Sequence, residues 1–310
     1  MNSSPLRWLV PAALLLVVLI VSTSAYIRLS QDGLGCAGWP DCYGRDVRLP
    51  AAGQLLPEPS DLFWARALHR FTASLVSVLL VMIALFGWKD ARGTRGAALA
   101  LLALAGFLGI LGVATPSTLP AVTIANLLGG MSMVALLWWL YRGRHEGPVP
   151  AGGGALAWLV IAALVLEIAL GGMMSARHAA LACVTLPACT GGWLPEVADW
   201  RVFNPFFGIG TAASAGYELQ AVAMAHRAGA VLVAALVVAL AVAMLRRSQE
   251  TARYGWIMLG LVGVQLPLGA VMVFASLPLP LALAHNLCAA LLFAAAAGLL
   301  RAARGAPEKA

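Results

Sequence analysis

Three histidines in otherwise apolar segments are the residues of this sequence best suited to chemistry. His69, in "LHR", His226, in "AHR", and His285, in "HNL", each lie near one end of a segment made mostly of Leu, Ala and Val. Ionisable side chains in such segments are costly and are usually functional. A lone histidine more often bonds one helix to another, but two histidines that face each other in a bundle can hold a six-coordinate haem iron. We therefore predict a haem between His226 and His285.

Two arginines directly follow histidines of this set. Arg70 comes after His69, and Arg227 comes after His226. A guanidinium pairs with a carboxylate in bidentate fashion, as the propionates of a haem would require. The alternative is that both side chains extend to lipid phosphates. Because the arginine recurs beside each histidine, we favour propionate binding.

Two polar segments carry cysteine pairs with the same spacing. "GLGCAGWPDCYG" (33–44) contains Cys36 and Cys42, and "ALACVTLPACTG" (180–191) contains Cys183 and Cys189. A gap of this length closes easily, and disulfides persist in oxidising compartments. We predict two local disulfides rather than free thiols, and no histidine accompanies either pair to suggest a metal site. Cys288 is expected to be a small packing residue.

Four further polar residues are weaker candidates. Glu167, in "LEIALGG", is costly to bury and is a possible functional residue. Gln265, in "QLPLGA", can orient a histidine or a haem substituent, or simply join two helices. His145 and His178 are predicted to be solvated loop residues.

The elements that must position these residues are membrane helices. Of the 310 residues, 61% are hydrophobic and only 11% are charged, whereas a soluble domain carries roughly a quarter charged residues. The net charge of +7 comes from short basic clusters between apolar runs, with no motif for nucleic acid. The sequence therefore predicts an all-α integral membrane protein. Eight segments have the length of a spanning helix: 8–27, 68–88, 96–114, 119–141, 155–175, 222–246, 254–274 and 279–303.

The distribution of basic residues predicts the orientation. Cytoplasmic loops of membrane proteins carry an excess of Lys and Arg. One set of helix ends carries such clusters, and the two long opposite loops, 28–66 and 176–221, have balanced charges. We therefore expect both termini in the cytoplasm and the cysteine loops in the periplasm of a bacterium, with the chain in the inner membrane. The basic ends carry Arg7, Lys89, Arg92, Arg95, Arg142, Arg144, Arg246, Arg247, Arg253, Arg301, Arg304 and Lys309.

The same features recur at a nearly fixed offset along the chain. The cysteine pairs are 147 residues apart, the His-Arg pairs are 157 apart, and "LPAVTIANLLGG" matches "LPLALAHNLCAA" at 159. This last match places Asn126 opposite His285. Such an offset indicates internal duplication. We predict two parallel four-helix repeats, over 1–142 and 155–310, joined by a cytoplasmic linker at 143–154.

These motifs resemble the haem A synthase family over nearly the whole chain. The resemblance rests on "YIRLSQDGLGCAGWPDCYG", its echo "LGGMMSARHAALACVTLPACTGG", the two His-Arg pairs and "HNL". It implies eight membrane helices in two similar halves. It also implies oxidation of one methyl group of haem O to a formyl group, which gives haem A for terminal oxidases.

The resemblance assigns a task to each half. It implies a b-type haem between His226 and His285 in the second half, and haem O as the substrate of the first half, with ligands at His69 and at the position of Asn126. It also associates the first cysteine pair with that substrate step. Haem O synthase, oxidase assembly factors and a second copy of the chain in a homo-oligomer are candidate partners, and the electron donor is not indicated.

The sequence departs from the family at two positions of the first half. Arg66 stands where the family usually has a glutamate, and Asn126 stands where it has a second histidine. Either His69 holds the substrate alone, with an open face beside Asn126, or the first half has lost catalysis and the protein only handles haem. We favour the enzyme. A periplasmic-facing thiol or quinone oxidoreductase is disfavoured because the cysteine spacing is long and no base lies nearby.

Overall fold

A computed structural model describes residues 5–31, 60–88, 94–114, 119–145, 154–189, 192, 199–207 and 216–304. These residues form eight α-helices and two short 3₁₀-helices, and they contain no β-strand. All eight α-helices are long and apolar enough to cross a membrane. The predicted all-helical membrane fold is therefore confirmed. The α-helices are α1 Leu6–Gln31, α2 Ser60–Gly87, α3 Thr94–Ala114, α4 Pro120–His145, α5 Gly154–Ala176, α6 Gly216–Leu245, α7 Gln249–Phe274 and α8 Leu279–Arg304.

Three helices begin five to eight residues earlier than the apolar segments that predict them. α2 begins at Ser60, before the predicted 68, and α6 begins at Gly216, before the predicted 222. α7 begins next to Ser248, whose side chain accepts a hydrogen bond from the backbone N–H of Thr251 in a capping box. A hydropathy window detects only the part of a helix that lies in hydrocarbon, so polar first turns escape it. The predicted segment 222–246 placed His226 near the start of its helix. Because α6 begins at Gly216, His226 instead lies well inside the helix.

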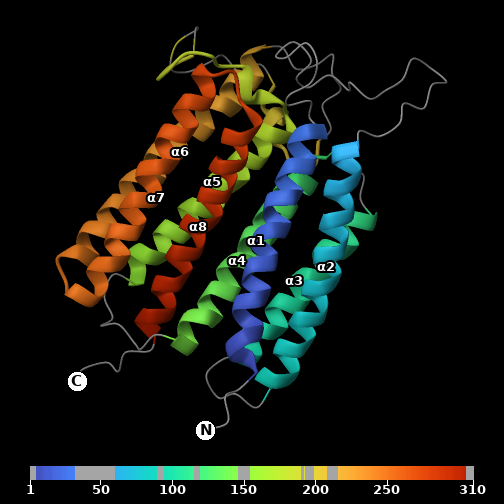
Figure 1. Cartoon of the computed structure of the whole chain (residues 1–310). Coiled ribbons are helices and arrows are strands. Elements are labelled where there is room, and N and C mark those ends of the chain that lie inside the picture. Colours follow the sequence, from blue (N-terminus) through green and yellow to red (C-terminus); the bar gives the residue numbers. More distant parts are fainter. Residues whose placement is uncertain are drawn as a thin grey trace.

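The helices form two groups in the order of the chain. In the first half α1 packs against α2 and α4, and α3 packs against the same two helices. In the second half α5 and α7 each pack against α6 and α8. Figure 1 shows the two groups side by side, with α1 beginning and α8 ending at the same end of the molecule. Each group is thus a ring of four helices in which neighbours in sequence are neighbours in space.

The two halves meet mainly through α4 and α8. α4 packs against α8 and α5, and α8 also packs against α1. In the predicted repeat α1 would correspond to α5, and α4 to α8. A two-fold relation would therefore exchange the α4–α5 contact with the α8–α1 contact, and the α4–α8 contact would lie on the axis. The duplication itself and the boundaries of the two repeats remain predictions. Most of the linker, residues 146–153, lies outside the described residues.

A buried arginine joins the halves at the end where α4 finishes. Arg142 is 2% exposed, and its Nη1 donates a hydrogen bond of 2.7 Å to the carbonyl of Gly298 on α8. Its Nη2 donates to the hydroxyl of Tyr254 on α7, and its guanidinium stacks over that ring. α4, α7 and α8 are therefore tied together at this end.

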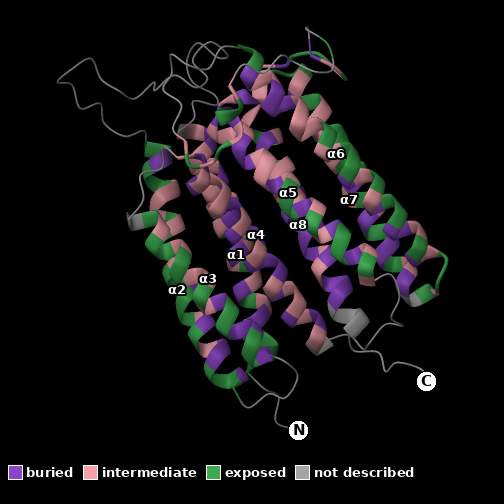
Figure 2. Cartoon of the chain, turned by 180° about the vertical axis from the view of Figure 1, so that it is seen from behind, coloured by how far each residue is buried: buried purple, intermediate pink, exposed green. Residues whose placement is uncertain are grey.

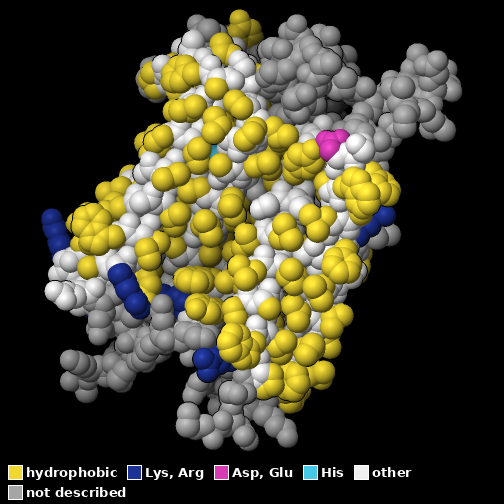
Figure 3. All heavy atoms as spheres, viewed as in Figure 1, with side chains coloured by type: hydrophobic (Ala, Val, Ile, Leu, Met, Phe, Trp, Pro, Cys, Tyr) yellow, Lys and Arg dark blue, Asp and Glu magenta, His cyan; other side chains and the backbone are white. Residues whose placement is uncertain are grey.

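The exterior of the bundle suits a lipid environment. Buried residues concentrate where helices face one another, and exposed residues follow the outer sides (Figure 2). Exposed side chains include many large apolar ones, such as Leu15, Leu85 and Val231, which are each 69–72% exposed. In the face shown in Figure 3 most surface is hydrophobic and the Lys and Arg side chains lie mainly towards one end. Water would not stabilise such a surface, so the chain is a multi-pass membrane protein.

Candidate functional site

One large cavity lies inside the second half. It has a volume of about 810 Å³, in the range of roughly 300–1,000 Å³ that is usual for ligand sites. Its walls are mostly apolar side chains of α5, α6, α7 and α8. α1 contributes Arg28 and Leu29, and α4 contributes Leu127 and Met131. The cavity therefore belongs to the second bundle, but the first half closes one side of it.

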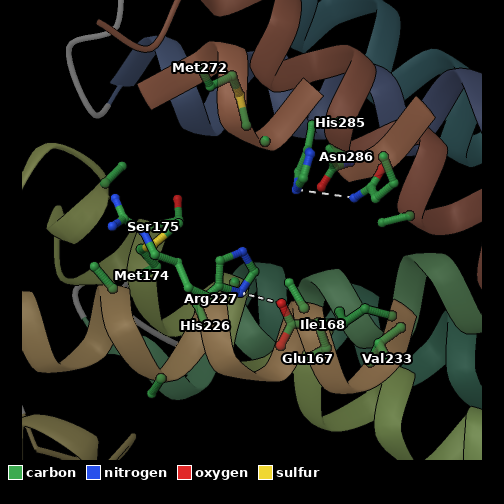
Figure 4. A pocket seen from close by; sticks show the side chains of 18 of the residues that line it. Glu167, Ile168, Met174, Ser175, His226, Arg227, Val233, Met272, His285 and Asn286 are labelled. Atoms are coloured by element: carbon green, nitrogen blue, oxygen red, sulfur yellow. Dashed lines mark hydrogen bonds and ion pairs between the residues drawn. The ribbon is translucent and has the colours of Figure 1, made fainter. Parts of the chain in front are cut away.

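His226 and His285 line this cavity from opposite walls. Figure 4 shows the two rings, from α6 and α8, pointing towards each other across open space. The two histidines thus line one cavity, as predicted. That a haem iron joins them remains a prediction. Among the described residues no group of three or more His, Cys, Asp or Glu side chains could hold a metal ion.

Glu167 holds the ring of His226. Its Oε1 lies 2.8 Å from Nδ1 of His226, and the two side chains are only 13% and 17% exposed. The other nitrogen of the ring, Nε2, points into the cavity (Figure 4). Glu167 was only a weak candidate in the sequence, because nothing along the chain shows which side chain it would meet. The structure pairs it with a predicted ligand.

Gln265 contacts the second histidine. Its amide nitrogen lies 3.1 Å from Nε2 of His285. Gln265 Oε1 and His285 Nδ1 are buried and have no hydrogen-bond partner among the described residues. Because Gln265 is on α7 and His285 is on α8, this contact agrees with two of the predicted roles, the orientation of a histidine and the joining of two helices.

A glycine lies beside each histidine and makes room for the ring. A Cβ at Gly171 on α5 would lie 3.2 Å from Cε1 of His226, and a Cβ at Gly269 on α7 would lie 3.3 Å from Cε1 of His285. Each glycine follows Glu167 or Gln265 by four residues, so one helix face presents both. In the sequence this spacing of a polar residue and a glycine reads "EIALG" and "QLPLG". Neither glycine was among the predicted site residues.

The second cysteine pair forms the predicted disulfide above the cavity. Cys183 and Cys189 are bonded, and both are buried. The guanidinium of Arg227 donates hydrogen bonds to the carbonyls of Cys183, Thr185 and Pro187 within that loop. Leu186 and Pro187 line the cavity, as does Arg227 itself. Arg227 thus fixes the loop over the site, and its predicted role with a propionate remains a prediction.

A short 3₁₀-helix, η2 Trp200–Phe203, completes the outer wall. Asp199 caps it by accepting a hydrogen bond from the backbone N–H of Arg201. Hydrogen bonds from the Arg201 guanidinium also lower the pKa of the Asp199 carboxyl. Arg177, which is buried, donates to the carbonyls of Val202 and Asn204. These contacts hold Trp200 and Phe203 against the cavity.

The predicted residues of the first half lie outside this cavity. His69 on α2 is half-buried, and its Nδ1 lies 3.5 Å from the hydroxyl of Thr23 on α1. Asn126 and Arg66 are also half-buried, whereas Arg70 is exposed. The two halves therefore separate the candidate residues into two sets. Cys36 and Cys42 lie outside the described residues.

The remaining candidates, Cys288, His178 and His145, do not line the cavity. Cys288 is a buried free thiol 3.4 Å from the carbonyl of Leu261, as expected for a packing residue. His178 follows α5 in a half-buried loop. His145, which we expected in a loop, is the last residue of α4, because that helix runs on past the apolar segment.

The cavity has the features that a haem needs. Two imidazoles face each other, the walls between them are apolar, and two guanidinium-bearing side chains, Arg28 and Arg227, line it. Imidazole nitrogens are common axial ligands of haem iron, and arginine pairs well with carboxylates. The residues present therefore fit a bis-histidine haem.

Comparisons with known proteins point the same way. Residues 7–297 match the model of a protein family described as cytochrome oxidase assembly protein. A protein of Shewanella oneidensis named "Heme A synthase" is 32% identical over 309 residues, which cover 93% of each chain. Proteins with the same name from Caulobacter sp. and Brucella anthropi are 26% and 25% identical, over 93% and 97% of this chain and 93% of each relative. The similarity covers both halves.

Proposed function

The chain belongs to the haem A synthase family, and on that premise we propose that it oxidises one methyl group of haem O to the formyl group of haem A. The observation that carries this proposal is the pair of histidines, His226 and His285, facing each other across one apolar cavity. A relative named "Heme A synthase" that matches 93% of the chain supports the same activity. The product would serve the biogenesis of terminal oxidases.

The second half holds a haem b between His226 and His285 in this proposal. A haem bound there supplies one-electron redox chemistry. The protein orients it through the imidazoles and keeps water away with the apolar walls of α5 to α8. Arg227, which lines the cavity, is the residue of this half that we propose to bind a propionate.

The first half receives haem O. His69 is the residue that holds the substrate there, and Asn126 leaves the opposite face of the substrate without an imidazole. An amide is a poor iron ligand compared with imidazole, so this face stays accessible. Arg66, in place of a carboxylate, changes the charge beside His69 but does not remove that ligand. The second predicted disulfide, between Cys36 and Cys42, belongs to the same half in this proposal.

The proposed location is the inner membrane of a bacterium. Both termini are cytoplasmic, and the cysteine loops are periplasmic. α1 begins and α8 ends at one end of the molecule, as this arrangement requires (Figure 1). Haem O synthase and oxidase assembly factors are the proposed partners, with a homo-oligomer as a further possibility to be measured by its size in detergent.

Haem analysis in cells tests the activity. The protein is expressed with haem O synthase in a host that makes no haem A, and the haems are extracted and separated by chromatography. We expect haem A with the wild-type protein and none with His69→Ala. His178→Asn is a matched control outside the cavity, and asparagine tolerates the left-handed backbone (φ 55°) at that position. If the wild type yields only haem B and haem O, the enzyme proposal fails and haem handling replaces it.

A further inference from the structure

The two cavity histidines are held in different ways. Glu167 contacts the ring nitrogen of His226 that faces away from the cavity, and Gln265 contacts the ring nitrogen of His285 that faces into it (Figure 4). A contact on the far nitrogen leaves the near one available, whereas a contact on the near nitrogen occupies it. The two ligands of the proposed haem are therefore not equivalent.

Glu167 is placed to do more than join α5 to α6. Its Oε1 lies 2.8 Å from Nδ1 of His226, within ion-pair distance, so a small turn of either group would let Nδ1–H donate to it and leave Nε2 free. Both side chains are at least four-fifths buried, so water competes little for this contact. Nδ1 of His226 and the second oxygen, Oε2, are both buried without a hydrogen-bond partner among the described residues, so neither has a competing partner there.

The neighbouring helix is shaped around this carboxylate. A Cβ at Gly229 on α6 would overlap Oε2 of Glu167 and would lie 3.1 Å from its carboxyl carbon. Gly229 lies three residues after His226, so one turn of α6 both presents the ring and makes room for its partner. Gly171 makes room for the ring itself on α5. The positions of Glu167 and His226 are thus fixed together.

We propose that Glu167 is the positioning residue of the haem site and makes His226 the stronger of its two axial ligands. The inference rests on the proposed haem between His226 and His285. A carboxylate on the far nitrogen raises the basicity of a ligating imidazole and fixes its orientation. Among the described residues no carboxylate contacts Nδ1 of His285, and its Nε2 would have to leave Gln265 before it could bind iron. His226 is the permanent ligand and His285 the displaceable one.

The reduction potential of the bound haem tests this inference. A more basic ligand stabilises ferric iron. Glu167→Gln keeps the shape of the side chain but weakens the acceptor, so the equilibrium ratio of ferric to ferrous haem at a given potential should fall roughly tenfold. For a one-electron couple that is a rise of ~59 mV in midpoint potential. The measurement is a spectroscopic redox titration of the purified holoprotein. Glu218→Gln is the matched control, because Glu218 is a buried carboxylate on α6 that does not line the cavity, and it should leave the potential unchanged.

A second variant reaches the same contact without touching Glu167. Gly229→Ala should push the carboxylate away from Nδ1 while α6 stays intact, because the end of a flexible side chain can yield. Its potential should rise in the same direction. Combined with Glu167→Gln, it should add less than the sum of the two single changes, since both remove one interaction.

The outcomes separate this inference from the proposed function. A wild-type protein that binds no haem would overturn both. A haem-loaded wild type whose potential is the same in Glu167→Gln, Gly229→Ala and Glu218→Gln would overturn the inference alone and leave Glu167 a structural contact. A rise in the first two variants with no change in the third supports it, whatever the yield of haem A.

Discussion

Each half of the molecule is a ring of four helices, but the two halves differ in how they hold their histidines. In the second half His226 has a carboxylate at 2.8 Å and His285 has an amide at 3.1 Å. In the first half His69 has a threonine hydroxyl at 3.5 Å, and that hydroxyl also bonds the carbonyls of Leu19 and Ile20. The hydroxyl partner of His69 thus lies farther away than the carboxylate and the amide that contact the histidines of the second half.

The difference extends to the helices that support the second ligand. The 159-residue offset that pairs Asn126 with His285 also pairs Gly106 and Ile110 with Gln265 and Gly269. Ile110 is 69% exposed and points away from the bundle. The first half thus has Asn126, Gly106 and Ile110 at the positions that this offset pairs with a histidine, an amide and a glycine of the second half. This pattern suits a permanent cofactor in one half and a passing substrate in the other.

Removal of the histidines gives the largest expected effect. His226→Ala and His285→Ala should lose the low-spin b-type haem, because each removes an axial ligand from a buried site. His69→Ala should keep that haem and lose haem A formation. The reduced-minus-oxidised absorption spectrum measures the first effect, and haem extraction measures the second. If His69→Ala removed the absorption band as fully as His226→Ala, the two halves would not have separate tasks.

A second imidazole in the first half is the next test. Asn126→His would give the substrate iron two strong ligands and close the open face, so most haem A formation should be lost. Asn126→Gln keeps an amide and is the control for a change of size. Haem chromatography gives the yields, and increased haem A with histidine would instead mark asparagine as a loss of function.

The glycines beside the rings should have intermediate effects. Gly171→Ala and Gly269→Ala place a methyl group 3.2 and 3.3 Å from the imidazoles, so each ring must shift by a few tenths of an ångström. We expect haem affinity to fall about tenfold. Gly106→Ala on α3 is the control, because a Cβ there meets nothing within 4 Å. Haem titration of the apoprotein measures the affinities, and equal values in all three variants would show that the close approach is unimportant.

Gln265 should have the smallest effect, in the opposite direction. Its hydrogen bond to Nε2 of His285 stabilises the haem-free protein by about 1 kcal/mol. Gln265→Ala removes this competition and should tighten haem binding by about fivefold. Gln220→Ala, on α6 and away from the cavity, is the control. Weaker binding in Gln265→Ala would mean that the amide supports the bound haem.

Hydropathy predicted the eight helices because each spanning segment satisfies its own backbone hydrogen bonds and must be apolar along its length. It missed the polar first turns of α2 and α6, which extend beyond the apolar segments. The facing of His226 and His285 followed from their similar depth in α6 and α8, which lie on opposite sides of the four-helix ring. Glu167 could not be paired with His226, because their contact depends on how α5 and α6 are rotated, which a sequence of uniform apolarity does not encode.

The cavity wall that α1 and α4 supply has a consequence for how the protein is made. Leu29, Leu127 and Met131 emerge from the ribosome before α5 to α8, so the first half can be inserted before the second bundle closes against it. The last helix, α8, brings both His285 and the main contact with α4. The cavity is therefore complete only after α8 has been synthesised, and loading of the proposed cofactor would be a checkpoint on the assembled second bundle.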